Sequence, residues 1–335
     1  MKTGVLIVNL GTPDSPSTSD VRKYLSEFLN DPRVIDINPI ARMILVNLII
    51  VPFRASRSAK LYKEIWQEDG KSPLLYFSEQ QHQLLSTKLG EKYDVQMGMR
   101  YQSPSIDIAL DHFKKQFYKK IVVLPLFPQY ASASTGSVHE KIMKTISKWE
   151  IVPEIEFISN FCDHPEFIES LVEVGKKYNY RDYDHVLMSF HGLPERQISK
   201  GDYFNHCLED GCCDELTDKN AYCYRAQCHQ TARKMAEAMS IPKDKYTICF
   251  QSRLGRDPWI KPYSDMVIKE RAKKGDKKLL VFAPAFVSDC LETIYEISVE
   301  YDELFKEAGG EKVQLVESLN DSPRWIEAMK NIMRL

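Results

Sequence analysis

Short apolar runs rich in β-branched residues alternate with longer amphipathic segments along the whole chain. The short runs have the length of buried strands, and the longer segments have the spacing of helices that cover a sheet. The sequence predicts strands at Val5–Leu10, Tyr93–Tyr101, Lys120–Phe127, Glu154–Ser159, His185–Phe190, Tyr246–Gln251, Lys278–Phe286 and Val313–Leu319. This alternation is typical of βαβ units, so we expect an α/β fold with parallel sheets.

Two of the expected helices carry start signals. Ser19 precedes DVRKYLSEFL, and Ser288 with Asp289 precedes CLETIYEISVEYDELF, which stops at Gly309 and Gly310. Small polar residues before an amphipathic run are typical of helix N-caps.

The pattern of strands and helices begins again near residue 150. We therefore expect two similar halves, 1–150 and 151–335, each with a parallel four-stranded sheet flanked by helices. The last helix could pack against the N-terminal half. No low-complexity linker separates the halves, and the cleft between them is the default binding site.

Charge and familiar motifs exclude several classes of function. Lys and Arg number 45 against 47 Asp and Glu, so no bulk basic field favours binding to nucleic acid. The chain has no GxGxxG after a strand and no GxxxxGK[ST], so we expect no nucleotide cofactor.

The apolar segments at the N-terminal end predict a cytoplasmic protein. The run that begins at Gly4 and ends at Leu10 is a first strand rather than a signal peptide. The longest apolar stretch, Ala41–Phe53, is interrupted by Arg42 and Asn47 and is shorter than the ~20 residues that span a bilayer. It could still touch a membrane surface.

Three segments are candidates for chemistry. His191 directly follows an apolar strand, at the edge where open α/β sheets bind ligands, although a structural histidine would look the same. Glu292, Glu296 and Glu300 follow a strand at helical spacing, a row that is often only a solvated face. The loop Pro128–Ser137 is rich in small hydroxyl residues and could approach a flat or anionic ligand.

In order, the motifs resemble the ferrochelatase family. They are GVLIVNLGTPDSPSTSDVRKYLSEFLNDPRVIDI, SPLLYFSEQQ, GMRY, PQYASASTGS, SFHGLP, CFQSRLGRDPW and APAFVSDCLETIYEI. The resemblance covers nearly the whole chain. It implies two Rossmann-like, chelatase-type halves and a lyase of haem synthesis that inserts Fe²⁺ into protoporphyrin IX or coproporphyrin III.

The resemblance also implies a set of site residues. His191 and Glu292 match the family's active-site histidine and glutamate, and Glu296 would extend an acidic line toward the Fe²⁺ substrate. Tyr130, Arg100 and Trp259 would lie near the porphyrin. Apolar residues of 34–53 would form a lip over the macrocycle and a surface for peripheral contact with the inner membrane face.

The reaction explains why such groups are needed. Two pyrrole protons must leave as the metal enters, which requires a base such as neutral His191. Hydrated iron must be delivered without being trapped, which suits the oxygen ligands of Glu292. The sequence leaves open which of the two takes protons and which guides metal.

An insertion at residues 204–228 departs from the family pattern and concentrates cysteines. They are Cys207, Cys212, Cys213, Cys223 and Cys228, while the other three are scattered. In a cytosolic chain such thiols are metal ligands or free thiols. Four of the five predict a [2Fe–2S] cluster, as in some members of the family, with structural zinc or no metal as the alternatives.

Two other functions remain open at this point. A chelatase that puts cobalt or iron into a sirohydrochlorin-type tetrapyrrole would share the fold. A non-catalytic porphyrin- or cluster-binding sensor is the second alternative.

Overall fold

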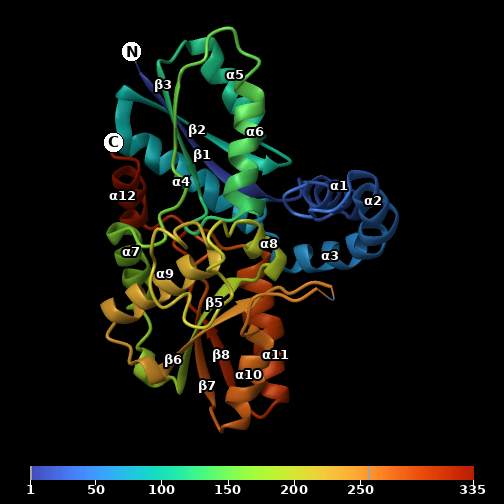
Figure 1. Ribbon diagram of the computed structural model, residues 1–335, viewed down its shortest axis with the longest axis vertical. Helices are drawn as coiled ribbons and strands as arrows, with labels where there is room; N and C mark the ends of the chain where they lie inside the picture. The colour runs from blue at the N-terminus through green and yellow to red at the C-terminus, as the bar shows by residue number, and fades with distance from the viewer. Residues whose placement is uncertain (1, 256) are drawn as a thin grey trace. The chain divides into compact units, whose positions relative to one another are not determined.

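The computed structural model describes residues 2–255 and 257–335 and contains two four-stranded parallel sheets (Figure 1). All eight predicted strands are present, which confirms the expected α/β fold class. The chain divides into two compact units. Unit 1 comprises residues up to Phe127, Ser132–Asn160 and Met329–Leu335, and unit 2 comprises Pro128–Ala131 and Phe161–Ala328.

The sheet of unit 1 has the strand order β2-β1-β3-β4. Its strands are β1 (Thr3–Gly11), β2 (Tyr93–Tyr101), β3 (Lys120–Pro125) and β4 (Glu154–Phe157). Residues 5–8 of central β1 are fully buried, as a strand covered on both faces requires. The flanking helices are α4 (Pro73–Leu89), α5 (Ile106–Gln116), α6 (Ser137–Ile146), the 3₁₀ turn Gly90–Lys92 and the short π-helix Ser132–Gly136.

A helical arm extends from β1 within unit 1. It consists of α1 (Thr18–Leu29), α2 (Pro39–Ile44), the π-helix η1 (Leu45–Ile50) and α3 (Val51–Ile65). The N-cap of α1 is Ser17 rather than the expected Ser19, because the Ser17 side chain accepts a hydrogen bond from the Asp20 N–H.

The arm changes one expectation about membranes. α2, η1 and α3 form one continuous helical run, Pro39–Ile65, that is long and apolar enough to cross a bilayer by length and composition alone. The stretch Ala41–Phe53 is thus part of a longer helical run that continues past Phe53. Its Asn47 side chain accepts hydrogen bonds from Ser26 and Asn30, which tie it to the α1 end of the arm.

The sheet of unit 2 has the equivalent order β6-β5-β7-β8. Its strands are β5 (His185–His191), β6 (Tyr246–Gln251), β7 (Lys278–Phe282) and β8 (Lys312–Leu315). Its helical elements are α7 (Pro165–Gly175), α8 (Glu195–Lys200), α9 (Tyr224–Ala238), α10 (Ser264–Lys273), the π-helix η6 (Glu292–Tyr301), α11 (Asp302–Glu307) and the 3₁₀ turns Tyr180–Asp182 and Lys243–Lys245. The last helix, α12 (Pro323–Ile332), begins in unit 2, and its residues from Met329 on belong to unit 1.

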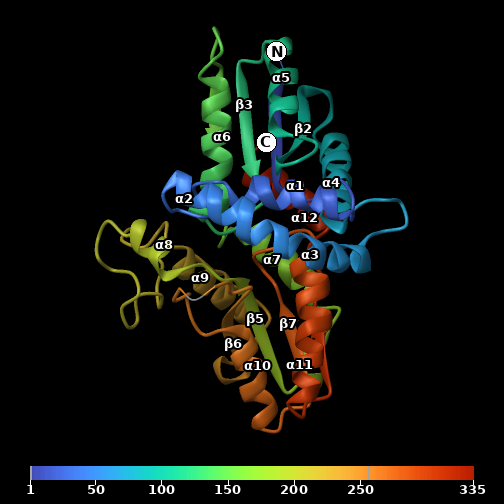
Figure 2. The same cartoon turned by 90° about the vertical axis from the view of Figure 1, so that its right-hand side faces the viewer.

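Elements of unit 2 meet in one apolar core. Leu187 on β5, Val281 on β7 and Ile297 on η6 are all fully buried in it. The π-helix and α11 run as one rod beside the sheet, and the insertion forms loops next to α8 and α9 (Figure 2). The strands β5 and β6 and the π-helix η6 are therefore attached to the same apolar core.

Candidate active site

His191 is the last residue of β5 and is half-buried. Its Nδ1 lies 2.7 Å from the carbonyl oxygen of Gly192. A carbonyl oxygen can only accept, so Nδ1 carries a proton, and in the neutral form of the ring Nε2 keeps its lone pair. The strand end therefore presents a lone pair that can take a proton or bind a metal.

Gly192 allows the backbone to turn tightly beside Trp259. Its N–H donates to the Gln251 carbonyl over 2.8 Å. A Cβ at this position would lie 2.9 Å from that carbonyl oxygen and 3.1 Å from the Trp259 ring, so only glycine fits. The glycine of the motif SFHGLP is therefore required for the tight turn that follows His191.

Aromatic rings line the histidine. The centroids of Trp259 and Phe286 each lie 6.5 Å from that of His191. The indole Nε1–H of Trp259 is buried and has no hydrogen-bond partner in the described residues. A buried donor of this kind is suited to a polar group of a ligand.

Glu292 begins the π-helix η6 and is half-buried. The Cys290 thiol donates a hydrogen bond to its carboxylate, and burial together with this carboxylate raises the pKa of Cys290, so the thiol stays protonated. π-Helical segments are rare in proteins, and those that occur are often found at functional sites. Of the expected acidic row, Glu296 is also half-buried, whereas Glu300 is exposed.

Glu296 is held by four donors. It accepts hydrogen bonds from the N–H and hydroxyl of Ser252 at 2.9 and 2.5 Å, the Tyr301 hydroxyl at 3.0 Å and the Gln251 amide at 3.2 Å. Burial and this carboxylate raise the pKa of Tyr301, so its hydroxyl remains a donor. The Glu296 carboxylate is thus fixed in place.

Gln251 connects the two candidate groups. It pairs with His191 in the β5–β6 register, and its amide donates to the Glu292 carbonyl over 3.1 Å. Its Oε1 accepts from the Ser189 hydroxyl over 2.8 Å. This buried side chain brings the histidine strand and the acidic helix together.

Tyr130 lies on a loop that is attached to α9. Its main-chain N–H donates to Gln227 over 2.6 Å, and the Gln129 amide donates to Thr231 over 3.0 Å. The Tyr130 ring packs against Tyr222 with a centroid separation of 5.4 Å.

Four of the five candidate cysteines are in contact with one another. The Cys223 thiol hydrogen-bonds with those of Cys207 and Cys213, and the sulfurs of Cys212 and Cys213 lie 3.6 Å apart. Cys228 is fully buried and makes its side-chain hydrogen bond with Tyr224. In residues 2–255 and 257–335, no group of three or more His, Cys, Asp or Glu side chains is arranged to hold a metal ion.

Arg100 belongs to unit 1. Its guanidinium donates to the Asp31 carboxylate over 2.6 Å and to the Ser137 hydroxyl over 2.6 Å. Asp31 also accepts from the Tyr101 hydroxyl at 2.9 Å. Arg100 is therefore part of a largely buried polar network.

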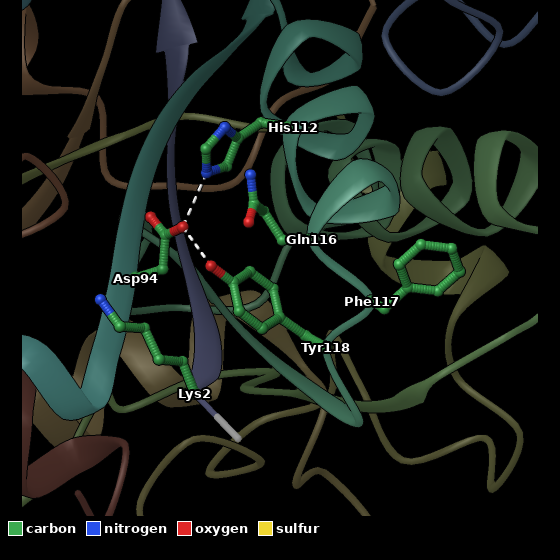
Figure 3. A pocket seen from close by; sticks show the side chains of 6 residues that line it. All are labelled: Lys2, Asp94, His112, Gln116, Phe117 and Tyr118. Atoms are coloured by element: carbon green, nitrogen blue, oxygen red, sulfur yellow. Dashed lines mark hydrogen bonds and ion pairs between the residues drawn. The ribbon is translucent and has the colours of Figure 1, made fainter.

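A hollow of about 380 Å³ lies at the amino ends of β1 and β2 (Figure 3). Inside it, Asp94 accepts hydrogen bonds from His112 at 2.6 Å and from Tyr118. Ligands in open α/β sheets bind at the carboxyl ends of the strands, so we assign this hollow no catalytic role.

Several residues that hold this site were not singled out from the sequence. They are Gln251, Ser252, Tyr301, Cys290 and Tyr224. A signal existed for Gln251, since it ends an apolar strand as His191 does. The others act through contacts that spacing alone does not reveal.

Known proteins resemble the chain over its full length. The family model Ferrochelatase matches residues 2–335. A "Ferrochelatase" of Legionella pneumophila (strain Lens) is 44% identical over 333 residues, covering 99% of each chain. A "Ferrochelatase" of Coxiella burnetii (strain CbuK_Q154) is 42% identical over 335 residues, covering 99% of this chain and 93% of the relative.

Solved structures resemble the fold at low sequence identity. "SirB from Bacillus subtilis with Fe3+" has a TM-score of 0.54 at 14% identity and covers 100% of this chain and 95% of its own. A cobalt complex of the sirohydrochlorin chelatase SirB from Bacillus subtilis subspecies spizizenii has a TM-score of 0.50 at 13% identity, covering 100% and 94%. These likenesses show a chelatase-type fold.

Proposed function

The chain belongs to the ferrochelatase family and is a porphyrin metal chelatase of haem synthesis, and from that premise we propose that His191 accepts porphyrin protons while Glu292 guides Fe²⁺. The tautomer of His191 carries this proposal, because its Nδ1–H is engaged by the Gly192 carbonyl and its Nε2 lone pair is free to act as a base.

The proton balance fits this assignment. Each of two pyrrole N–H bonds breaks, its electron pair stays on nitrogen, and the porphyrin dianion binds Fe²⁺ without a change in oxidation state. Nε2 of His191 takes a pyrrole proton and releases it to solvent before the second transfer. Since the Gly192 carbonyl orients the ring, it also stabilises the imidazolium that forms.

Glu292 suits delivery of ferrous iron. Its carboxylate is a hard oxygen ligand, and the neutral Cys290 thiol beside it orients it without competing as a thiolate. Glu296, saturated by its four donors, serves in this proposal as fixed negative charge along the metal route.

Trp259, Tyr130 and Arg100 remain our candidates for contact with the porphyrin. Trp259 offers an apolar wall beside His191 and a free indole N–H. Tyr130 lies on a loop fixed by α9, which would hold its ring against a flat ligand.

Anaerobic metallation assays test the function directly. Protoporphyrin IX and coproporphyrin III should each be titrated with Fe²⁺ while loss of porphyrin fluorescence is followed, with sirohydrochlorin as the competing substrate. Turnover of a porphyrin and none of sirohydrochlorin is expected. Sirohydrochlorin turnover would favour the alternative chelatase, and porphyrin binding without turnover would favour a sensor; the family membership favours neither.

We further propose that Cys207, Cys212, Cys213 and Cys223 hold a [2Fe–2S] cluster. Their chemistry fits, since two thiolates on one tetrahedral metal with metal–sulfur bonds of ~2.3 Å lie about 3.8 Å apart, and Cys212 and Cys213 are separated by 3.6 Å. The hydrogen bond from Cys213 and the N–H of Ala226 lower the pKa of Cys223 below its usual range, which favours a thiolate at this position. A bound cluster would cross-link the insertion.

Spectroscopy with metal analysis tests the cluster. Protein purified without oxygen should show visible charge-transfer bands and about two irons and two sulfides per chain. Changing each of the four cysteines to serine should remove the bands, whereas Cys249→Ser, a buried thiol of β6, should keep them. Zinc without sulfide would mean a structural zinc site, and neither would mean a loop of free thiols.

The helical arm of unit 1 is our candidate for the porphyrin lip and for peripheral membrane contact of a cytoplasmic enzyme. Its exposed apolar side chains are Ile40, Met43, Ile44, Leu48, Ile49 and Phe53, of which Phe53 is 80% and Leu48 69% exposed. An apolar surface on a helix with flanking Arg42, Arg54 and Arg57 is typical of interfacial binding.

Vesicle sedimentation tests this surface. Leu48→Glu with Phe53→Glu should abolish pelleting with anionic vesicles. Phe117→Glu, which changes a 71% exposed apolar residue just after α5, is the matched control and should pellet as the wild type does. Porphyrin titration of both variants separates the role of the lip from membrane contact.

A further inference from the structure

Three consecutive residues at the end of the insertion contact three different parts of unit 2. The Tyr222 ring packs on Tyr130 at 5.4 Å with an interplanar angle of 85°. The Cys223 thiol joins Cys207 and Cys213. The Tyr224 hydroxyl donates to the main-chain carbonyl of His191 over 2.8 Å.

The Tyr224 contact fixes the backbone of the candidate base. Tyr224 is buried, and its hydroxyl also hydrogen-bonds with the buried thiol of Cys228. The carbonyl it binds belongs to His191 and directly precedes Gly192, whose own carbonyl orients the imidazole. Loss of the hydroxyl would leave the His191 carbonyl without this partner and remove one of the hydrogen bonds that hold the loop that sets the direction of Nε2.

The Tyr222 contact involves Tyr130, the candidate porphyrin residue on the loop attached to α9. Tyr130 is attached to α9 through the Gln227 side chain, whose amide also donates to the Ala221 carbonyl over 2.5 Å. Tyr222 is 62% exposed, so its ring contact with Tyr130 is not enforced by burial in a core. The orientation of Tyr130 thus depends on where residues 221–222 are held.

Cys223 lies between Tyr222 and Tyr224 at the start of α9. It is the N-cap residue of this helix, and its sulfur accepts hydrogen bonds from the N–H groups of Ala226 and Arg225. Because Tyr222 and Tyr224 are its immediate neighbours in the chain, a displacement of Cys223 would also displace the peptide groups that carry both rings.

We infer that Tyr222 and Tyr224 are positioning residues that couple the cysteine cluster to the reaction, Tyr224 through the His191 backbone and Tyr222 through Tyr130. The inference rests on the proposed roles of His191 and Tyr130. It assigns the insertion a function in turnover: ordered thiols, whether they hold a metal or not, keep the base and the porphyrin loop aligned.

Two tyrosine variants test the two contacts separately. Tyr224→Phe should lower kcat about tenfold, the value of one hydrogen bond, and leave the porphyrin Kd from fluorescence quenching unchanged. Tyr222→Ala should weaken porphyrin binding about fivefold with little change in kcat, and Tyr222→Phe, which keeps the ring, should restore wild-type affinity. Phe204→Ala, which removes a 61% exposed aromatic ring from the same insertion, should change neither quantity.

A double-mutant cycle tests the coupling without any turnover. With no Fe²⁺ substrate added, the porphyrin Kd of the protein as purified is measured for Cys223→Ser, Tyr222→Ala and the double variant. Cys223→Ser should weaken binding, and adding Tyr222→Ala should weaken it no further. Additive effects would overturn the coupling, and if Cys223→Ser does not fold, the contrast between Tyr222→Ala and Tyr222→Phe decides.

The wild type and His191→Ala are measured in parallel. A wild type that binds but does not metallate porphyrin would overturn the proposed function. Normal wild-type turnover, an inactive His191→Ala, and tyrosine variants that behave as Phe204→Ala would overturn this inference alone.

Discussion

The Nδ1–H of His191 donates to the carbonyl of Gly192, the next residue in the chain, over 2.7 Å. The carbonyl that fixes the tautomer of His191 therefore belongs to the loop that directly follows this residue. This loop is held from two sides, because the Gly192 N–H donates to Gln251 and the His191 carbonyl accepts from Tyr224. An imidazole held in this way can accept a proton without first reorienting.

His191→Ala should abolish metal insertion and leave porphyrin binding measurable. Removal of the proposed base should cost at least about 100-fold in kcat, the usual contribution of a positioned general base. His112→Ala, which removes a half-exposed histidine of unit 1, should retain activity. Near-normal turnover of His191→Ala in the anaerobic assay would contradict the assignment.

Glu292→Gln should impair iron delivery more than porphyrin binding. The substitution keeps the side-chain shape and an acceptor for the Cys290 thiol but removes the charge that attracts Fe²⁺. We expect the KM for Fe²⁺ to rise and kcat to fall about tenfold or more, with the porphyrin Kd unchanged. Glu300→Gln, an exposed position of the same helix, is the control, and equal kinetics of the two variants would refute the metal-guiding role.

The sequence was sufficient to predict the strands because they are short apolar runs between turn signals, and the central strands β1, β3, β5 and β7 are buried over most of their length. The same apolar pattern placed His191 at a strand end, where the structure has it. The N-cap of α1 was missed because Ser15, Ser17 and Ser19 all suit a cap, and only the bond from Asp20 selects Ser17. Periodicity cannot distinguish an α-helix from a π-helix, so the geometry of η6 was not foreseen.

Glu296→Gln should destabilise the fold near η6. The carboxylate accepts from Ser252, Tyr301 and Gln251, and the amide NH₂ of glutamine would face donors that need an acceptor. Unpaired buried donors cost about 1–3 kcal/mol, so the free energy of unfolding in urea should fall by that amount. Glu300→Gln again serves as the control, and a Glu296→Gln variant as stable as the wild type would mean that the four bonds contribute nothing net.

His185 should make the protein less stable in mild acid. This first residue of β5 is 3% exposed, and its Nε2 lies 2.8 Å from the Thr247 hydroxyl. Burial and the nearby Arg271 charge lower its pKa to about 4, whereas an unfolded histidine titrates near pH 6.5. Between those values the unfolded chain binds a proton that the folded chain does not, so the free energy of unfolding decreases as pH falls, by about 2 kcal/mol between pH 7 and pH 5 for this residue.

Urea unfolding of wild type and His185→Gln at both pH values measures the difference, because glutamine can keep a bond to Thr247 but does not titrate. The variant should lose about 2 kcal/mol less than the wild type, and parallel losses would show that His185 is protonated in the folded state.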